Sequence, residues 1–199
     1  MAIRILSRNP KGYFLMVEGG RIDHAGHENR GLCDVTDTLA FDKAIKVGVE
    51  LTKGKKGGGT LIVVTADHET GGLTINGYAH VEIGGDKLLT TQVPAGSDIL
   101  TYASGPGADR TANLQREKTD VDYLQPSLIK APKALHSGVD VIAWATGPGS
   151  DAFHGTIDNT DVAKIILREM KLKDFDAGAS GDCCVKKSPV SLKDLLGAL

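Results

Sequence analysis

The sequence has few cysteines and no strong excess of charge of either sign. Its 199 residues include 3 cysteines, and 23 basic residues nearly balance 25 acidic ones, which gives a formal net charge of -2. Three cysteines do not make the disulfide framework of a small secreted protein. A nearly neutral chain offers no polybasic surface, so we expect neither a nucleic acid nor an anionic membrane as a partner.

Long apolar runs are also absent. No stretch reaches the roughly 20 apolar residues that a membrane-spanning helix needs, and residues 1–11 lack the apolar core of a signal peptide. Cys183 and Cys184 are adjacent, a spacing that suits zinc poorly, and we interpret them as incidental loop thiols. The cysteines therefore leave the cellular compartment open.

The remaining composition is that of an ordinary globular protein. Hydrophobic residues make up 41% of the chain and charged residues 24%. A chain of this length is long enough to bury a sizeable core, so we expect one domain over residues 1–199.

Two apolar runs each lead into an acidic residue and a histidine. The run at 13–17 precedes Glu18 and two glycines, and the run at 61–64 precedes Asp67 and His68. Both runs are typical of buried strands. After the first run, Asp23 and His27 are four residues apart, so a helix would place them on the same face. Carboxylate oxygen and imidazole nitrogen suit zinc, and two such strand ends predict one metal cluster.

A helix is predicted between the two strands, over residues 34–53. Its expected apolar face consists of Ala40, Ala44, Val47 and Leu51. Asp34 or Thr36 would cap its start, and Gly54 would end it. Strand, helix and strand together predict a βαβ unit in a parallel sheet. The glycine-rich segment 54–60 follows a helix and opens a strand, which is the wrong order for a phosphate-binding loop.

The rest of the chain alternates less regularly. Residues 76–134 are rich in turn-forming residues and predict a surface excursion of hairpins and loops. A further strand is predicted at 139–145 and a helix at about 161–170, capped within Asp158–Thr160. The segment from residue 171 is polar, with a short helix expected from Ser191.

Three segments of the sequence resemble the alkaline phosphatase family. They are 18–27, 65–72 and 136–140, they occur in the family's order, and the resemblance extends from near residue 8 to near 170. Segment 65–72 looks more like bacterial members than animal ones. The resemblance implies a three-layer α/β/α sandwich around a mostly parallel sheet. This chain would be its C-terminal, metal-binding part, with the N-terminal part absent.

The resemblance also implies the residues of a metal site. The first zinc would be bound by Asp23, His27 and His136, the second zinc by Asp67 and His68, and magnesium by Glu18, with His24 as a possible phosphate contact. From the residues alone, the third ligand of the first zinc is either His136, before the strand at 139–145, or His154, beyond it. His136 carries the family motif, and an antiparallel strand after it would place it at the metal end.

The implied reaction is hydrolysis of phosphate monoesters through a phosphoserine intermediate. In the family the serine nucleophile lies N-terminal to every segment matched here, so no catalytic nucleophile is expected within these residues. Ser97 and Ser150 neither follow a strand nor open a helix, so we interpret both as loop residues. The family also implies a homodimer and a periplasmic or extracellular location.

Other interpretations stay open at this point. The chain could be a non-catalytic domain that keeps metal ligands as a binding module. A phosphomutase or sulfatase of the same superfamily is disfavoured by segments 65–72 and 136–138. Glu69 is expected to orient His68, or else to be a surface acid. His80 and His154 have no motif partner and are expected to be solvated or capping histidines.

Overall fold

The computed structural model describes residues 1–53, 59–76, 80–83, 86–89, 98–113 and 115–171. The chain divides into two compact units, Met1–Ser150 and Asp151–Leu199, where the sequence predicted one domain. The predictions for Gly54, most of the 54–60 segment, Ser97, Cys183, Cys184 and the helix from Ser191 fall outside the described residues.

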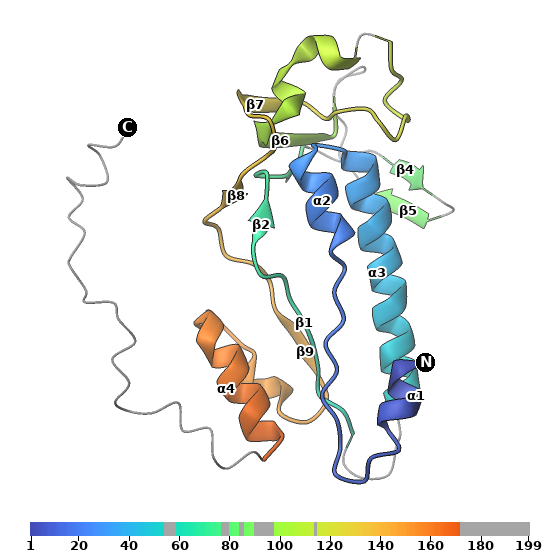
Figure 1. The fold of residues 1–199 in the computed structure, drawn as a ribbon, viewed down its shortest axis with the longest axis vertical. Coiled ribbons are helices and arrows are strands. Elements are labelled where there is room, and N and C mark those ends of the chain that lie inside the picture. Colours follow the sequence, from blue (N-terminus) through green and yellow to red (C-terminus); the bar gives the residue numbers. More distant parts are fainter. Residues whose placement is uncertain (54–58, 77–79, 84–85, 90–97, 114, 172–199) are drawn as a thin grey trace, which may run out of the picture. The chain divides into compact units, whose positions relative to one another are not determined.

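The first unit begins with three helices and no strand. α1 spans Ala2–Leu6, α2 spans Arg21–His27 and α3 spans Gly31–Thr52. The strand predicted at 13–17 is not formed, because no described strand pairs with this segment, and it runs as plain trace into α2 (Figure 1). Its apolar side chains are largely exposed, with Met16 at 70%.

Helix α3 is confirmed, but its buried face differs from the predicted one. Ala40, Ala44 and Val47 are exposed, whereas a row that includes Phe41, Ile45 and Val49 is partly covered. Apolar residues occur on more than one side of this helix, so periodicity alone could not select the covered side. Neither predicted cap is used: Arg30 precedes the first turn, and Asp34 lies buried within it.

The described strands form short ladders that are mostly antiparallel. β1 (Ile62–Val64) pairs with β9 (Trp144–Thr146), β2 (Glu69–Thr70) with β8 (His136–Ser137), β3 (Thr74–Ile75) with β6 (Leu100–Gly105), and β4 (His80–Ile83) with β5 (Asp86–Leu89). Only β6 and β7 (Ser127–Lys130) pair in parallel among these elements. The described residues therefore do not form the parallel βαβ unit that the sequence predicted. The strand after His136, β9, is antiparallel to β1, which is the direction that would place His136 at the metal end.

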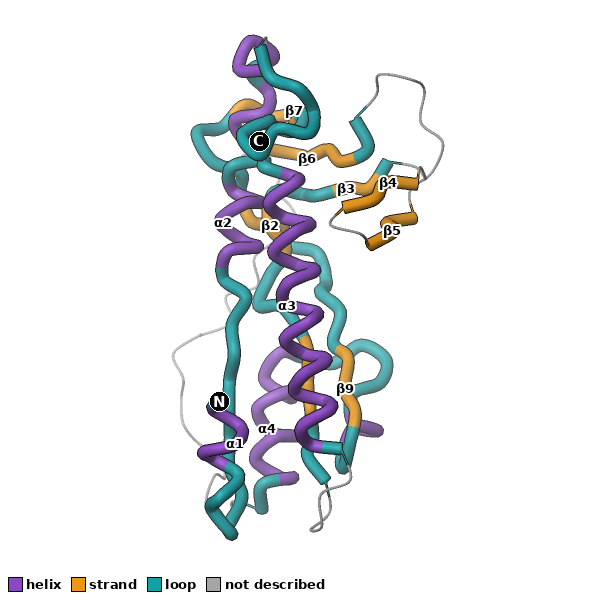
Figure 2. Tube along the Cα trace, turned by 90° about the vertical axis from the view of Figure 1, so that its right-hand side faces the viewer, coloured by secondary structure: helices purple, strands orange, loops and turns teal. Residues whose placement is uncertain are grey.

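The stretch 76–134 is not confined to the surface. It contains the β4–β5 hairpin, as expected of an excursion, and two 3₁₀ turns, η1 (Pro106–Ala108) and η2 (Arg110–Asn113). It also supplies Tyr102 and Tyr123, two of the buried hydrophobic side chains among the described residues. The Tyr102 hydroxyl bonds to Asp34 of α3, and α2 and α3 lie side by side in Figures 1 and 2.

Asn29 connects three segments at the end of α2. Its side chain is fully buried, donates hydrogen bonds to the carbonyl oxygens of Gly26 and Ser104, and accepts one from the amide of Gly107. Its backbone oxygen accepts from Gln125. The residue adopts φ 54°, a left-handed conformation that asparagine tolerates better than most residues. One side chain thus closes helix α2 and fixes the β6 region against it.

Asp34 and Tyr102 form a second buried link. The Tyr102 hydroxyl donates to Asp34 Oδ2 at 2.7 Å, and the two residues are 3% and 6% exposed respectively. Burial raises the pKa of Asp34 to about 6, an increase that the Tyr102 hydrogen bond opposes and the charge of Asp23 reinforces. Burial also raises the pKa of Tyr102. The hydroxyl therefore remains the donor at neutral pH.

The second unit contains α4 (Asn159–Glu169), and the predicted cap is confirmed. Asp158 precedes the helix, and its side chain accepts a hydrogen bond from the amide of Thr160 at 2.9 Å. Ile165 is the buried side chain of this helix. η3 (Ser150–Ala152) begins at the last residue of the first unit, the Ser150 that we interpreted as a loop residue. In the part of the chain that the structure describes, no helix is long and apolar enough to cross a membrane.

We expect Asn29→Ala to lower the free energy of unfolding by roughly 2–4 kcal/mol, because the buried carbonyl of Ser104 and amide of Gly107 lose their bonds to the side chain, whereas the Gly26 carbonyl keeps its bond from the Asn29 amide. Asn29→Gly loses the same bonds but relaxes at positive φ, so it should cost about 1 kcal/mol less. Denaturant unfolding of both variants measures the difference. A glycine variant less stable than the alanine variant would contradict this account.

Asp34→Asn should change the pH dependence of stability. Since the pKa of Asp34 in the folded chain exceeds the ordinary value of 3.8, the stability that Asp34 contributes is fully present below pH 4 and is lost as pH rises through about 6. The asparagine variant cannot ionise and keeps an acceptor for Tyr102. Its stability relative to wild type should therefore rise between about pH 4 and 7, by roughly 1–3 kcal/mol. Urea unfolding of the variant and of wild type across this pH range measures the difference. Asp42→Asn, exposed on the same helix, is the control. A stability difference that does not change with pH would contradict this prediction.

Candidate metal centre

Helix α2 brings Asp23 and His27 to one face, as their four-residue spacing requires wherever the chain is helical. The two residues are one turn apart, and His27 Nε2 lies 3.4 Å from Asp23 Oδ2. The helix can approach β2 closely because Gly26 has no side chain: a Cβ there would lie 3.1 Å from Thr70 Cγ2. A larger residue would push the helix and its two polar side chains away from β2.

His136 joins this pair from β8. Its Nε2 lies 3.1 Å from His27 Nε2 and 3.4 Å from Asp23 Oδ1. Ligand atoms of all three residues lie within 4.8 Å of one another. Segments 109 residues apart in the sequence therefore present two imidazole nitrogens and one carboxylate to a common point.

The ring of His27 is held in one orientation by the segment before β8. Its Nδ1 lies 2.7 Å from the carbonyl oxygen of Ala134, and the amide of Ala134 donates to the carbonyl oxygen of His27 at 2.8 Å. A carbonyl oxygen only accepts, so Nδ1 carries the proton and Nε2 offers its lone pair to the cluster. This arrangement is typical of histidines that bind metals.

Asp23 is kept ionised by its surroundings. Thr70 Oγ1 donates to Asp23 Oδ1 at 2.6 Å. Burial raises the pKa of Asp23, but this hydrogen bond and the electrostatic attraction of the neighbouring imidazoles of His27, His136 and His68 outweigh it, so the pKa lies below its usual value. The carboxylate therefore keeps its negative charge, which a cation requires of its ligand.

Asp67 and His68 lie directly beside this cluster. The His68 ring stacks on His136 with ring centroids 3.5 Å apart, and His68 Nε2 lies 3.2 Å from Asp67 Oδ2. The Asp67 side chain is 86% exposed. The two predicted sets of zinc ligands thus meet through the His68 and His136 rings.

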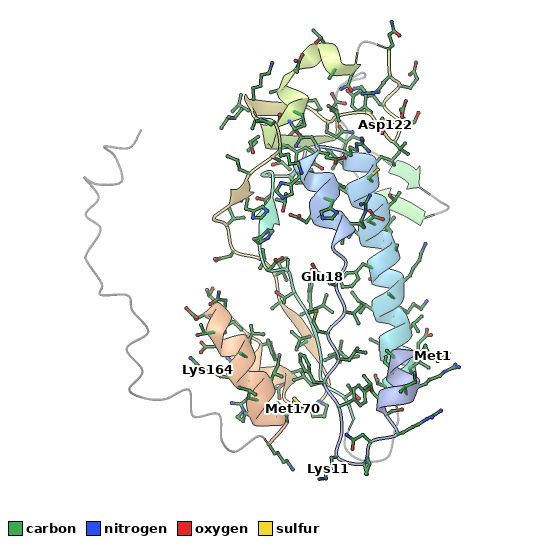
Figure 3. The ribbon with its side chains drawn as sticks, in the orientation of Figure 1. Met1, Lys11, Glu18, Asp122, Lys164 and Met170 are labelled. Carbon is green, nitrogen blue, oxygen red and sulfur yellow. The ribbon has the colours of Figure 1, made fainter. Side chains whose placement is uncertain are left out.

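Glu18 and His24 are less closely involved. Glu18 is exposed in the trace that leads into α2 (Figure 3), and no described contact joins it to the three clustered residues. His24 is exposed on α2 and lines a cavity of about 240 Å³ that it shares with His27, Arg21, Arg30 and Lys133. The cavity places positive side chains beside the cluster, although Glu28 and Asp37 also line it.

The structure adds supporting residues that the sequence reasoning missed. Thr70, Ala134 and Ser137 are the main ones. Glu69 was expected to orient His68, but its carboxylate accepts hydrogen bonds from Ser137 and Leu73 instead. Thr70 lies inside segment 65–72, which carries the family resemblance, so the sequence could have indicated its role. Ala134 acts through its backbone, which no pattern of residue types reveals. His154 is exposed, with Nδ1 2.5 Å from the Asp151 carbonyl oxygen, and His80 lies in β4.

The clustered residues fit a zinc ion by their chemistry. Zinc in catalytic sites takes three protein ligands drawn from histidine and carboxylate side chains and leaves a fourth position open. Asp23, His27 and His136 are such a set, and the backbone bond on His27 Nδ1 leaves the other ring nitrogen free to coordinate.

Comparison with known proteins identifies the family. The family described as Alkaline phosphatase matches residues 1–172. Membrane-bound alkaline phosphatase of Bombyx mori is 40% identical over 127 residues, covering 61% of this chain and 22% of the relative. Alkaline phosphatase 4 of Bacillus subtilis is 32% identical over 195 residues, covering 85% of this chain and 42% of the relative.

A solved structure of the same family is similar to this chain. A TAB5 alkaline phosphatase mutant with Mg bound in its M3 site is similar with a TM-score of 0.55 and 28% identity, over 85% of this chain and 39% of that one. The chain thus spans well under half the length of these relatives. The family match over residues 1–172, with the cluster of Asp23, His27 and His136 inside it, shows that the chain belongs to the alkaline phosphatase family.

Proposed function

We propose that this chain is the metal-binding part of a zinc- and magnesium-dependent phosphatase that hydrolyses phosphate monoesters. The observation that carries the proposal is the convergence of Asp23, His27 and His136 within 4.8 Å, in a chain of the alkaline phosphatase family. These three residues bind the first zinc, and Asp67 and His68 bind the second. The stacking of His68 on His136 supports two adjacent ions.

The proposed chemistry assigns a definite task to each part of the site. When bound, a pair of zinc ions activates a nucleophilic oxygen and stabilises the leaving oxygen of the phosphate ester. Asp23 supplies the negative charge, and Thr70 fixes which of its oxygens faces the metal. Ala134 holds the His27 ring so that Nε2 faces the site. His24, with Arg21 beside it in the cavity, contacts the phosphate.

Further assignments rest on the family. Glu18 is the proposed magnesium ligand, and an exposed carboxylate suits an ion that keeps several waters. No residue of this sequence matches the family's serine nucleophile, so we propose that polypeptide outside these 199 residues supplies it and forms the phosphoserine. With that polypeptide, the described elements complete a three-layer α/β/α sandwich, and the protein is a periplasmic or extracellular homodimer.

Zinc titration tests the ligand set. His27→Ala and His136→Ala should each weaken zinc binding at the first site by at least the roughly 10–100-fold that loss of a supporting residue costs. His154→Ala should leave the affinity nearly unchanged, because among the described residues His154 does not belong to the group whose ligand atoms lie together. Competition with a chromophoric chelator measures all three, with circular dichroism as the folding control. If His154→Ala weakened zinc binding and His136→Ala did not, the third ligand would be His154 and the proposed ligand set would be wrong.

A chimera tests the activity. This chain should replace the matching part of Bacillus subtilis alkaline phosphatase 4, and the chimera should hydrolyse an aryl phosphate in the presence of zinc and magnesium. Asp67→Ala in the chimera should lower kcat/KM by more than about 100-fold, since it removes a metal ligand rather than a supporting residue. The 199-residue chain alone should show no turnover. Zinc binding by the chain together with an inactive, folded chimera would favour the non-catalytic binding module.

A further inference from the structure

The ladder that carries His136 is very short. β2 and β8 pair over only two positions, Glu69 with Ser137 and Thr70 with His136. Successive side chains of a strand point to opposite faces, and paired residues share a face. Thr70 and His136 accordingly face Asp23, whereas Glu69 and Ser137 face the other side. So short a ladder holds its strands weakly by backbone bonds alone.

Glu69 reinforces the ladder from that other side. One of its oxygens, Oε2, accepts from both the amide and the hydroxyl of Ser137; the amide bond is 3.3 Å long. The second oxygen, Oε1, accepts from the amide of Leu73 at 2.9 Å, beyond the glycine turn that follows β2. Hydrogen bonds to a carboxylate are stronger than those between neutral groups. A single side chain therefore joins the start of β2, the turn after it and β8.

The glycine turn makes this geometry possible. Gly71 adopts φ +85°, and a Cβ there would lie 2.7 Å from Tyr102 Cδ1. Its amide donates to the carbonyl oxygen of Leu135 at 2.8 Å, and the Ser104 hydroxyl accepts from the amide of Leu135 at 3.0 Å. His136 is thus flanked on one side by the bonds to Leu135 and on the other by the bonds from Ser137 to Glu69.

We infer that Glu69 is the positioning residue that holds His136 in the metal cluster. The His136 side chain is 43% exposed, and apart from the neighbouring histidine rings its place depends on the residues that fix its backbone. Glu69 itself is not a ligand, because its two oxygens are used by Ser137 and Leu73. The inference rests on the proposed zinc site and adds a residue that acts on it only through His136.

The test compares zinc affinities in two backgrounds. Glu69→Gln should weaken zinc binding by roughly 10–100-fold, as loss of a residue that orients a ligand does. In the His136→Ala background the same substitution should change the affinity by less than about twofold, because the residue through which it acts is gone. Glu50→Gln, exposed on α3, is the matched control and should bind zinc like wild type.

Two results would overturn the inference. One is Glu69→Gln binding zinc as tightly as wild type, and the other is an equal loss with and without His136. A merely structural role would lower stability in both backgrounds without this dependence on His136. If the wild-type chain binds no zinc, it is the proposed function that fails.

Amide hydrogen exchange in the metal-free chain tests, independently of zinc, whether Glu69 holds β8 in place. In Glu69→Leu, whose side chain has no acceptor, the Ser137 amide loses its side-chain partner and should exchange about tenfold faster, the change expected for one lost hydrogen bond. The Ala134 amide, which is bonded to His27, should keep its rate. An unchanged rate at Ser137 would show that Glu69 does not hold this strand.

Discussion

The paired hydrogen bonds between His27 and Ala134 are the contact on which the candidate metal centre depends. They join the end of α2 to the segment before β8 across 107 residues of sequence. The backbone bond fixes the distance between the two segments, and the imidazole bond fixes the tautomer and direction of the His27 ring. Both effects are needed, because a ligand in the right place with the wrong nitrogen exposed would not coordinate a metal.

Around this contact the charges are arranged for a cation. Asp23 lies among His27, His68 and His136, and its pKa is lowered although burial opposes this. Thr70 donates to the carboxylate and occupies the position opposite His136 in the β2–β8 ladder. A network of this kind keeps the carboxylate ionised when no metal is bound, so binding does not first require its deprotonation. Asp34 in the neighbouring helix α3 differs from Asp23, because burial raises the pKa of Asp34 and its hydrogen-bond partner is a neutral hydroxyl.

The buried polar links explain how so few apolar side chains hold the site. Asn29 joins α2 to the loops around β6, and Tyr102 joins β6 to α3 through Asp34. Each link satisfies polar groups that would otherwise be buried without partners, which makes the arrangement of the segments specific. These links come from the stretch 76–134, which the sequence suggested was a surface excursion. Its turn-rich composition hid the fact that individual tyrosine, serine and glutamine residues are buried.

The sequence by itself determined the elements whose signals are local. The four-residue spacing of Asp23 and His27 puts both on one face of α2 once that helix forms, and Asp158 predicted the start of α4, because helix periodicity and caps act within a few residues. The motif at 136–138 also selected His136 over His154 as the third member of the cluster. Tertiary structure decided the rest: the covered side of α3, the absence of a strand at 13–17 and the antiparallel pairing of β1 with β9. A strand forms only where a partner strand supplies its hydrogen bonds, and the supporting contacts of Ala134 and Glu69 join residues far apart in the chain. No pattern within either segment encodes such pairings, which is why they appeared only when the chain was folded.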